Sequence, residues 1–214
     1  MGSWENLPVS PDPFPRSADT DEPLRGWVDA LVSTPGLTSI RDRGEAWRVH
    51  VQDSLTALPL LAELPGSIVD VGSGGGAPGI PLAAALPDRE VTLLESNRRK
   101  AAFLRTTAEA FPNVRVVWGR AEEQELEQFG VALAKALAPP PVAVEWCLPL
   151  VAIGGAVILW VGPSADRAAV GEVARRVGAA PPEVHAGLLV LRKVEPTPPG
   201  FPRRPGIARK RPLA

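Results

Sequence analysis

Cysteine, methionine, histidine and tyrosine are scarce in this chain of 214 residues, which has one Cys, one Met, two His and no Tyr. The single cysteine, Cys147, excludes an internal disulfide framework and a cysteine-ligated zinc site. With so few soft ligands, the sequence predicts no metal site. An unpaired cysteine is typical of the reducing cytoplasm, where we therefore expect the protein to be found.

The chain also lacks a long uninterrupted hydrophobic run and an excess of charge of one sign. Proline, glycine or a charged residue interrupts each apolar stretch before it reaches the ~20 residues needed to span a bilayer. The first residues contain neither a basic leader nor an apolar segment, so no signal peptide is expected. Lysine and arginine (23) nearly balance aspartate and glutamate (24), and the net charge of −1 gives no general attraction to nucleic acid.

This near-neutral total conceals two ends of opposite charge. Residues 1–26 contain five acidic and two basic residues together with five prolines, whereas residues 192–214 contain seven basic residues and one acidic residue. A proline-rich acidic segment buries little apolar surface, so residues 1–23 are predicted to be flexible. Residues 196–214 are predicted to form an extended basic tail that adapts to phosphates on binding.

Between these ends, hydrophobic periodicity predicts a short N-terminal helical extension over residues 24–64 and an α/β domain over residues 65–195. In the extension, helices are predicted at 24–33 and 43–63, the second kinked or split at Pro59. In the domain, helices are predicted at 78–86, 98–111, 142–151 and 165–177. Strands are predicted at 67–72, 90–95, 114–118, 131–136, 156–161 and, with a turn inside it, 183–194. This alternation predicts a doubly wound, mostly parallel sheet with helices on both faces.

A glycine-rich loop follows the first predicted strand. Residues 70–79 read Asp-Val-Gly-Ser-Gly-Gly-Gly-Ala-Pro-Gly and lead into a predicted helix. Glycines let the chain turn sharply and let a ligand lie against the backbone, while the helix N-terminus presents free amides. Four glycines in five residues have little packing value in a structural turn, so the loop predicts a nucleotide-cofactor site at the switch point of the sheet.

The loop by itself fits two cofactors, NAD and S-adenosylmethionine (SAM). Gly72, Gly74 and Ala77 match the dinucleotide pattern, and Glu95 lies where an acidic residue holds a ribose diol in both enzyme classes. Asp70 favours SAM, because a carboxylate is unfavourable beside a pyrophosphate and suits a sulfonium and an ammonium group. The lack of tyrosine also excludes a Tyr–Lys catalytic pair, which disfavours an NAD-dependent oxidoreductase.

Three stretches carry a more specific signal. Residues 36–42 read Gly-Leu-Thr-Ser-Ile-Arg-Asp, residues 49–54 read Val-His-Val-Gln-Asp-Ser, and the glycine loop continues as Ile-Pro-Leu to residue 82. Together they resemble the small-subunit ribosomal RNA guanine-N7 methyltransferases, the RsmG or GidB family. The basic stretch at 201–213 is similar to the family's terminus, so the resemblance covers residues 37–213.

The resemblance implies a seven-stranded SAM-dependent methyltransferase fold and methylation of N7 of one guanine in bacterial 16S rRNA. It implies that Lys135 faces cofactor and substrate at the catalytic centre, where His50 and Asp53 have an orienting role. Without the family, a surface pair on one helix face is the preferred interpretation of His50 and Asp53, and Asp70 and Glu122 fit helix caps or solvated acidic residues. The implied cofactor-binding residues are Asp70, Gly72, Gly74, Gly76, Ala77, Glu95, Ala121, Glu122 and Lys135.

The resemblance implies that the partner is 16S rRNA or the small ribosomal subunit. It also implies that the protein is a monomer that does not bind a membrane. Two departures from the family reduce the charge expected to face RNA. Lys135 replaces a family arginine and loses its bidentate fork, and residues 159–162 read Leu-Trp-Val-Gly where the family has Leu-Lys-Gly. A SAM-binding paralogue with a changed substrate or lost activity therefore stays open. Contacts with RNA are expected from Lys135 and from the tail residues Arg203, Arg204, Arg209, Lys210 and Arg211.

Overall fold

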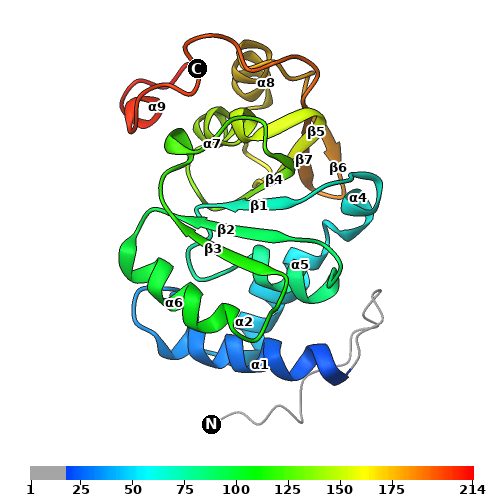
Figure 1. The fold of residues 1–214 in the computed structure, drawn as a ribbon, viewed down its shortest axis with the longest axis vertical. Coiled ribbons are helices and arrows are strands. Elements are labelled where there is room, and N and C mark those ends of the chain that lie inside the picture. The colour runs from blue at the N-terminus through cyan, green and yellow to red at the C-terminus, as the bar shows by residue number, and fades with distance from the viewer. Residues whose placement is uncertain (1–17) are drawn as a thin grey trace.

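The computed structural model describes residues 18–214, which fold around one seven-stranded sheet (Figure 1). The strand order is β3-β2-β1-β4-β5-β7-β6; the first five strands run parallel, and β7 runs antiparallel to both of its neighbours. The chain starts in the middle and winds to one edge before it crosses to the other, which confirms the predicted doubly wound sheet. The strands are β1 (Ile68–Val71), β2 (Val91–Glu95), β3 (Val114–Trp118), β4 (Phe129–Lys135), β5 (Val151–Trp160), β6 (Glu183–His185) and β7 (Leu188–Arg192).

Helices lie on both faces of this sheet, as predicted. Figure 1 shows α1, α2, α5 and α6 on one side and α7 and α8 on the other. The N-terminal and first-face elements are α1 (Ala18–Ser33), α2 (Arg43–Ala46), the π-helical turn η2 (Trp47–Gln52), α3 (Asp53–Leu55), α4 (Leu58–Glu63), α5 (Gly79–Ala85) and α6 (Arg98–Ala108). The remaining ones are η3 (Ala121–Glu123), α7 (Pro140–Cys147), η4 (Leu148–Leu150), α8 (Arg167–Arg176) and α9 (Ile207–Lys210).

Two hydrophobic cores, one on each face, hold the layers together. Successive strand residues point to opposite faces, so Ile68 of β1 joins the core under α1–α6 and Val69 joins the core under α7 and α8. Every residue of β1 and β2 is buried, as expected for central parallel strands covered on both sides. The sheet is therefore a rigid support whose carboxyl ends position the loops.

The N-terminal helical region begins earlier than predicted. Helix α1 starts at Ala18 and includes Pro23, so the prediction of a flexible segment is wrong for residues 18–23. Leu24 and Trp27 are buried in the first core, and this packing outweighs the backbone donor that the proline lacks. The flexibility predicted for residues 1–17 lies outside the described residues. The predicted split at Pro59 is confirmed, since α4 begins at Leu58 after a break at residues 56–57.

The boundary between α7 and β5 also differs from the prediction. The sequence predicts that the helix continues to Val151 and ends at a Gly-Gly pair, whereas β5 already starts at Val151. A strand over 151–160 pairs with β4 and lets Gly155 approach the carbonyl of Gly130, where a Cβ atom would collide. Tertiary pairing of the apolar run with β4 thus overrides its helical periodicity.

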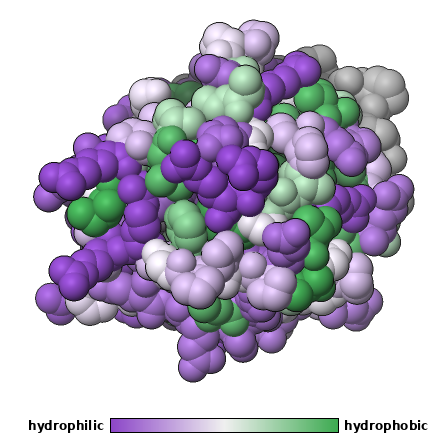
Figure 2. All heavy atoms as spheres, turned by 90° about the horizontal axis from the view of Figure 1, so that it is seen from above, coloured by the Kyte–Doolittle hydropathy of each residue, from purple (hydrophilic) through white to green (hydrophobic). Residues whose placement is uncertain are grey.

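The carboxyl-terminal tail is folded onto the body of the protein, which corrects the prediction of a simply extended segment. It contains α9, Ala208 is buried, and Phe201 and Leu213 pack against the second core. Figure 2 views the molecule from this end and shows a largely hydrophilic surface with small separate apolar areas. Among residues 18–214, no helix combines the length and the apolar composition that a membrane span requires.

Candidate functional site

The glycine loop between β1 and α5 has the conformation that only its glycines adopt without strain. Gly72, Gly74 and Gly76 have φ of 70°, 59° and 109°, in the left-handed region. The amide of Gly72 donates to the carbonyl of Leu94 over 2.7 Å, which ties the loop to the end of β2. The loop is also held from the N-terminal side, because Trp27 Nε1 donates to the carbonyl of Gly75 over 2.8 Å.

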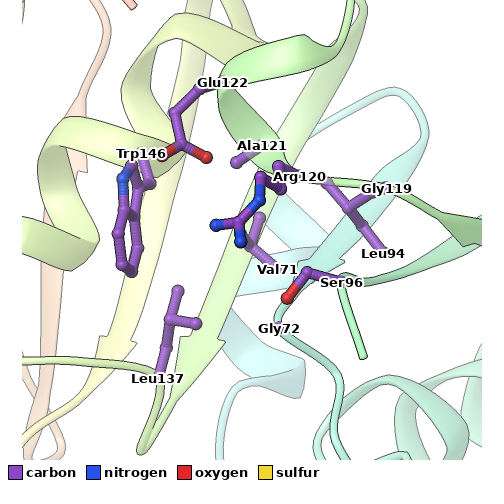
Figure 3. A pocket seen from close by; sticks show the side chains of 10 residues that line it. All are labelled: Val71, Gly72, Leu94, Ser96, Gly119, Arg120, Ala121, Glu122, Leu137 and Trp146. Carbon is purple, nitrogen blue, oxygen red and sulfur yellow. The ribbon is translucent and has the colours of Figure 1, made fainter. Parts of the chain in front are cut away.

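Two cavities meet at Gly72. The first, the β3-side pocket (Figure 3), has a volume of about 60 Å³ and is lined by Val71, Gly72, Leu94, Ser96, Gly119, Arg120, Ala121, Glu122, Leu137 and Trp146. The second, the helical-side cavity, has a volume of about 290 Å³ and lies between the glycine loop, the N-terminal helical region and the end of β4. It is lined by Leu31, Leu37, Val49, His50, Gly72, Ser73, Gly74, Gly75, Ala77, Lys100, Lys135 and Ala136.

The predicted cofactor residues divide into those that line these cavities and those that lie behind them. Gly72, Gly74, Ala77 and Lys135 line the helical-side cavity, and Ala121 and Glu122 line the β3-side pocket. Gly76 lines neither, and a Cβ atom there would collide with Ile80. Position 76 therefore needs glycine because of the local backbone conformation and packing, and not because it lines either cavity.

Asp70 lies beneath the glycine loop rather than on a cavity wall. Its side chain is 1% exposed, and Oδ2 accepts the amide of Gly79 at the start of α5 over 3.0 Å. Burial raises the pKa of Asp70 to about 7, assisted by the charge of Glu95 and opposed by the hydrogen bond from Gly79. Its Oδ1 has no hydrogen-bond partner in residues 18–214. This buried carboxylate positions the loop and would be stabilised by a cation bound nearby.

The two predicted glutamates already make backbone contacts. Glu95 accepts the amides of Gly74 over 2.8 Å and Asn97 over 2.6 Å, so it braces the glycine loop from the end of β2. Glu122 accepts the amide of Gly206 over 3.0 Å, which joins the wall of the β3-side pocket to the carboxyl-terminal tail. Direct cofactor contact by Glu95 or Glu122 stays a prediction.

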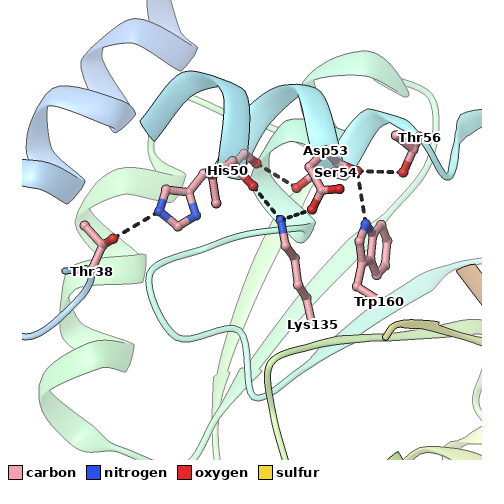
Figure 4. Close-up of polar contacts among 8 residues, drawn as sticks. Thr38, His50, Asp53, Ser54, Thr56, Lys135 and Trp160 are labelled. Atoms are coloured by element: carbon pink, nitrogen blue, oxygen red, sulfur yellow. Dashed lines mark hydrogen bonds and ion pairs between the residues drawn. The ribbon is translucent and has the colours of Figure 1, made fainter. Parts of the chain in front are cut away.

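His50 and Lys135 line the helical-side cavity, and Asp53 forms an ion pair with Lys135 beside it (Figure 4). Lys135 extends from the end of β4, and its Nζ lies 2.6 Å from Asp53 Oδ2 and donates to the carbonyl of Val49 over 2.6 Å. The π-helical turn η2 carries His50, whose Nε2 lies 3.1 Å from the Thr38 hydroxyl. Lys135 therefore fixes the helical region against the sheet while it lines the cavity.

The imidazole of His50 is kept neutral by its surroundings. Burial lowers the pKa of His50, the positive charge of Lys135 lowers it further, and Asp53 partly opposes both. A neutral ring at pH 7 can accept or donate one hydrogen bond at each nitrogen, according to its tautomer. The cluster thus offers a fixed cation and a polar neutral ring.

Several residues of the site were not predicted from the sequence. Trp146 and Leu137 supply apolar walls of the β3-side pocket, and Lys100 lines the helical-side cavity. The sequence pattern around Lys100 indicates a solvated helix start, with an RNA surface as the second interpretation. Trp160 stands in the stretch that lacks the family lysine, and its Nε1 donates to the carbonyl of Asp53 over 3.0 Å.

The arrangement fits SAM. A Cβ atom added at Gly74 would have no heavy atom closer than 3.7 Å, so a ligand can approach this backbone. In the β3-side pocket, Leu94, Leu137 and Trp146 provide apolar walls that suit a flat ring, next to the charged groups of Arg120 and Glu122. The helical-side cavity beyond Gly72 contains His50, Lys100 and Lys135. The buried, unpartnered carboxylate oxygen of Asp70 suits a cationic ligand on the other side of the loop.

Comparison with known proteins agrees with this geometry. Residues 27–174 match the GidB family, described as rRNA small subunit methyltransferase G. The chain is 37% identical to ribosomal RNA small subunit methyltransferase G of Moorella thermoacetica over 83% of this chain and 82% of the relative. It is 36% identical to the protein of the same name from Synechococcus elongatus, over 94% and 92%.

Solved structures share the fold at low sequence identity. A geranyl diphosphate methyltransferase in complex with SAM aligns with a TM-score of 0.53 and 14% identity, over 77% of this chain and 95% of that one. The fold prediction is confirmed, and the NAD alternative receives no support. The chain therefore belongs to the GidB family, as its motifs predict, and is a SAM-dependent methyltransferase.

Proposed function

We propose that this protein transfers the methyl group of SAM to N7 of a guanine in 16S rRNA. The observation that carries the proposal is the meeting at Gly72 of two cavities, one of about 60 Å³ beside β3 and one of about 290 Å³ lined by His50 and Lys135. We assign the adenosine half of SAM to the first and the methionine half to the second. Membership of the methyltransferase G family supports RNA of the small subunit as the substrate class.

In this proposal the glycine loop holds the methionine half of SAM. Gly72, Gly74 and Ala77 line the helical-side cavity, and Glu95 braces the loop through the amide of Gly74. SAM supplies a methyl group that its own sulfonium has already activated. Ala121 and Trp146 bound the pocket for the adenine ring, with Glu122 at its rim.

Guanine N7 has an in-plane lone pair and no proton to lose, so no general base is needed at the acceptor. The protein's task is alignment of acceptor and donor, which can account for a large part of a rate enhancement. Lys135 is already bound to Asp53 and to the carbonyl of Val49, so it positions the helical region and adds positive charge at the cavity wall. His50 is neutral and suits a hydrogen bond to a base edge.

The carboxyl-terminal tail and Lys135 are the proposed rRNA contacts of a monomeric protein. Arg204, Arg209, Lys210 and Arg211 are exposed on the tail, where they suit phosphate groups. Arg203 differs, because its guanidinium is bound to Glu145. The tail is thus proposed to contact RNA through four of its five predicted residues.

The test is methyl transfer from labelled SAM to purified 16S rRNA and to whole small subunits, followed by mapping of the modified base. We expect Lys135→Ala to lower turnover by about 100-fold or more, because misplacement of the cavity wall disturbs alignment. SAM affinity, measured by calorimetry, should change little. Lys135→Arg, which restores the family residue, should recover activity, and Arg105→Ala, at an exposed position of α6 outside both cavities, is the control for loss of a positive charge. Full turnover in Lys135→Ala would refute its role, and SAM binding without transfer to either RNA would favour a paralogue with another substrate.

A further inference from the structure

Trp118 is an exposed aromatic side chain at the end of β3. Its side chain is 52% exposed, whereas Trp27 and Trp47 are 2% and 5% exposed. Among the aromatic residues of 21–214, it alone belongs to the exposed class. A large exposed ring that contributes to neither hydrophobic core indicates a surface that binds something.

The ring is held in one orientation. Its Nε1 donates to the carbonyl of Ser96 over 3.0 Å, and the guanidinium carbon of Arg98 lies 5.7 Å from the ring centroid. Such a pair combines an aromatic surface with a positive charge, and its side-chain freedom is already restricted before a ligand arrives. The pair therefore resembles a prepared contact rather than a free side chain.

Its position relates it to the cofactor site. Trp118 and Glu95 are partners at the carboxyl ends of β3 and β2. Ser96, which binds the indole, and Gly119 and Arg120, which follow it, all line the β3-side pocket. The Trp118–Arg98 pair thus lies beside the rim of the pocket proposed for adenosine.

Basic residues stand at the start of α6 and just after β3, although the following turn η3 is acidic. Arg98, Arg99 and Lys100 begin α6, and Arg120 follows β3. Within residues 18–214, no carboxylate forms an ion pair with any of these four. Arg99 donates to the carbonyl of Pro35, which leaves its charge uncompensated. A polyanion with planar groups matches this combination of a ring and unpaired cations.

We propose that Trp118 and Arg98 form a stacking site for one unpaired base of the RNA substrate, with Arg98 and Arg120 beside its phosphates. The inference rests on the proposed function, since it assumes an RNA substrate at this edge of the sheet. RNA is favoured over an apolar partner because a cation, Arg98, lies against the ring. The other large exposed hydrophobic side chains lie outside β3 and α6; they are Leu126, Ile153, Val184 and Val194. Any base can stack on an aromatic ring, so the site would add affinity for RNA without selecting a particular base sequence.

The experiment measures binding of labelled 16S rRNA, and separately of SAM, to full-length variants. Trp118→Ala should weaken RNA binding by about 5- to 100-fold, the range of one lost stack. Trp118→Phe keeps a ring and should retain most of the affinity, whereas Trp118→Leu should not. Arg98→Gln should reduce the salt dependence of binding by about one phosphate contact. Arg105→Gln, an exposed arginine near the other end of α6, is the matched control and should change little.

Two outcomes would overturn the stacking site. RNA affinity that is unchanged in Trp118→Ala would show that the ring does not contact RNA, even if the wild-type protein methylates 16S rRNA. A loss of SAM affinity equal to the loss of RNA affinity would make Trp118 a part of the cofactor pocket instead. If the wild-type protein binds RNA through Trp118 but transfers no methyl group, the proposed function fails and the stacking site stands.

Discussion

The Glu145–Arg203 and Asp53–Lys135 ion pairs each join distant segments of this protein, and they differ in their exposure to solvent. Glu145 of α7 binds Arg203 of the tail through both oxygens, over 2.5 and 2.6 Å, and the two side chains are 2% and 21% exposed. Asp53 binds Lys135 through one oxygen over 2.6 Å, and Asp53 is 48% exposed. The first pair closes a structural contact, whereas the second remains open to solvent beside a cavity.

The difference in burial decides which pair contributes more to the free energy of unfolding. A buried carboxylate that loses its cation keeps its full desolvation cost, whereas a half-exposed one is rehydrated. The Glu145–Arg203 pair should therefore dominate the attachment of the tail, and the Asp53–Lys135 pair should matter mainly for the shape of the cavity.

The largest effect is expected from Arg203→Ala. It leaves Glu145 buried without a cation and should lower the free energy of unfolding by about 3 kcal/mol. Arg204→Ala, at the exposed neighbouring position, should change it by less than about 0.5 kcal/mol. Chemical denaturation of both variants measures the difference. Equal stability of the two variants would contradict the structural assignment of Arg203.

A second expected effect concerns Asp70, a buried carboxylate that has no cation at hydrogen-bond distance among residues 18–214. Its pKa is raised to about 7, so the folded state retains a proton that the unfolded chain loses near pH 4. This protonation stabilises the fold fully below about pH 4, and the stabilisation declines as the pH rises and is lost above about pH 7.

Asp70→Asn removes this titration and keeps an acceptor for the amide of Gly79. Burial of the new amide group offsets part of the gain, so we expect the variant to be about 1 kcal/mol more stable than wild type at pH 8. At pH 5 the advantage should disappear. Unfolding curves of both proteins across this range measure the effect, and a difference that is independent of pH would place the pKa of Asp70 elsewhere.

A smaller effect on stability is expected from Asp53→Asn. The exposed pair should contribute less than about 1 kcal/mol to the free energy of unfolding. The variant should nevertheless lower the pKa of His50 further, because Asp53 is the group that raises it, whereas Lys135→Met should move that pKa upward. Proton NMR can follow this titration, since the chain has only two histidines. A His50 pKa that is the same in both variants would contradict the arrangement of the cluster.

The sequence predicts best what is decided locally. The glycine loop and the strand before it depend on backbone conformations that few other residues adopt, so the residues at 70–79 predict both the turn and its position in the sheet. Helical spacing already pairs His50 with Asp53, whereas only the family resemblance links Lys135 to them, because no local pattern connects it with that helix. The ion pair between Lys135 and Asp53 depends on the packing of η2 against the end of β4.

Other features depend on tertiary packing that leaves little trace in the sequence. Seven basic residues among the last 23 indicate a solvated tail, yet Arg203 is bound by a buried glutamate of α7. Leu137 and Trp146 resemble ordinary core residues and become pocket walls only because β4, α7 and the glycine loop converge. The end of α7 differs from the sequence prediction for a similar reason, since pairing of residues 151–160 with β4 decides their conformation.

The smallest effect is expected from Trp160→Phe, which tests how the Asp53–Lys135 pair is held in place. Trp160 and Lys135 are partners across β5 and β4, and the indole Nε1 donates to the carbonyl of Asp53. Phenylalanine keeps most of the packing and removes this hydrogen bond, so stability should fall by about 1 kcal/mol or less. If the hydrogen bond positions Asp53, turnover of Trp160→Phe should fall while its SAM affinity is kept. Trp160→Lys introduces the residue type that the family has in this stretch. It should restore the positive charge but not the position of Asp53. Kinetics that are unchanged in Trp160→Phe would show that Lys135 alone positions Asp53, which would sharpen the contrast with the two-point contact between Glu145 and Arg203.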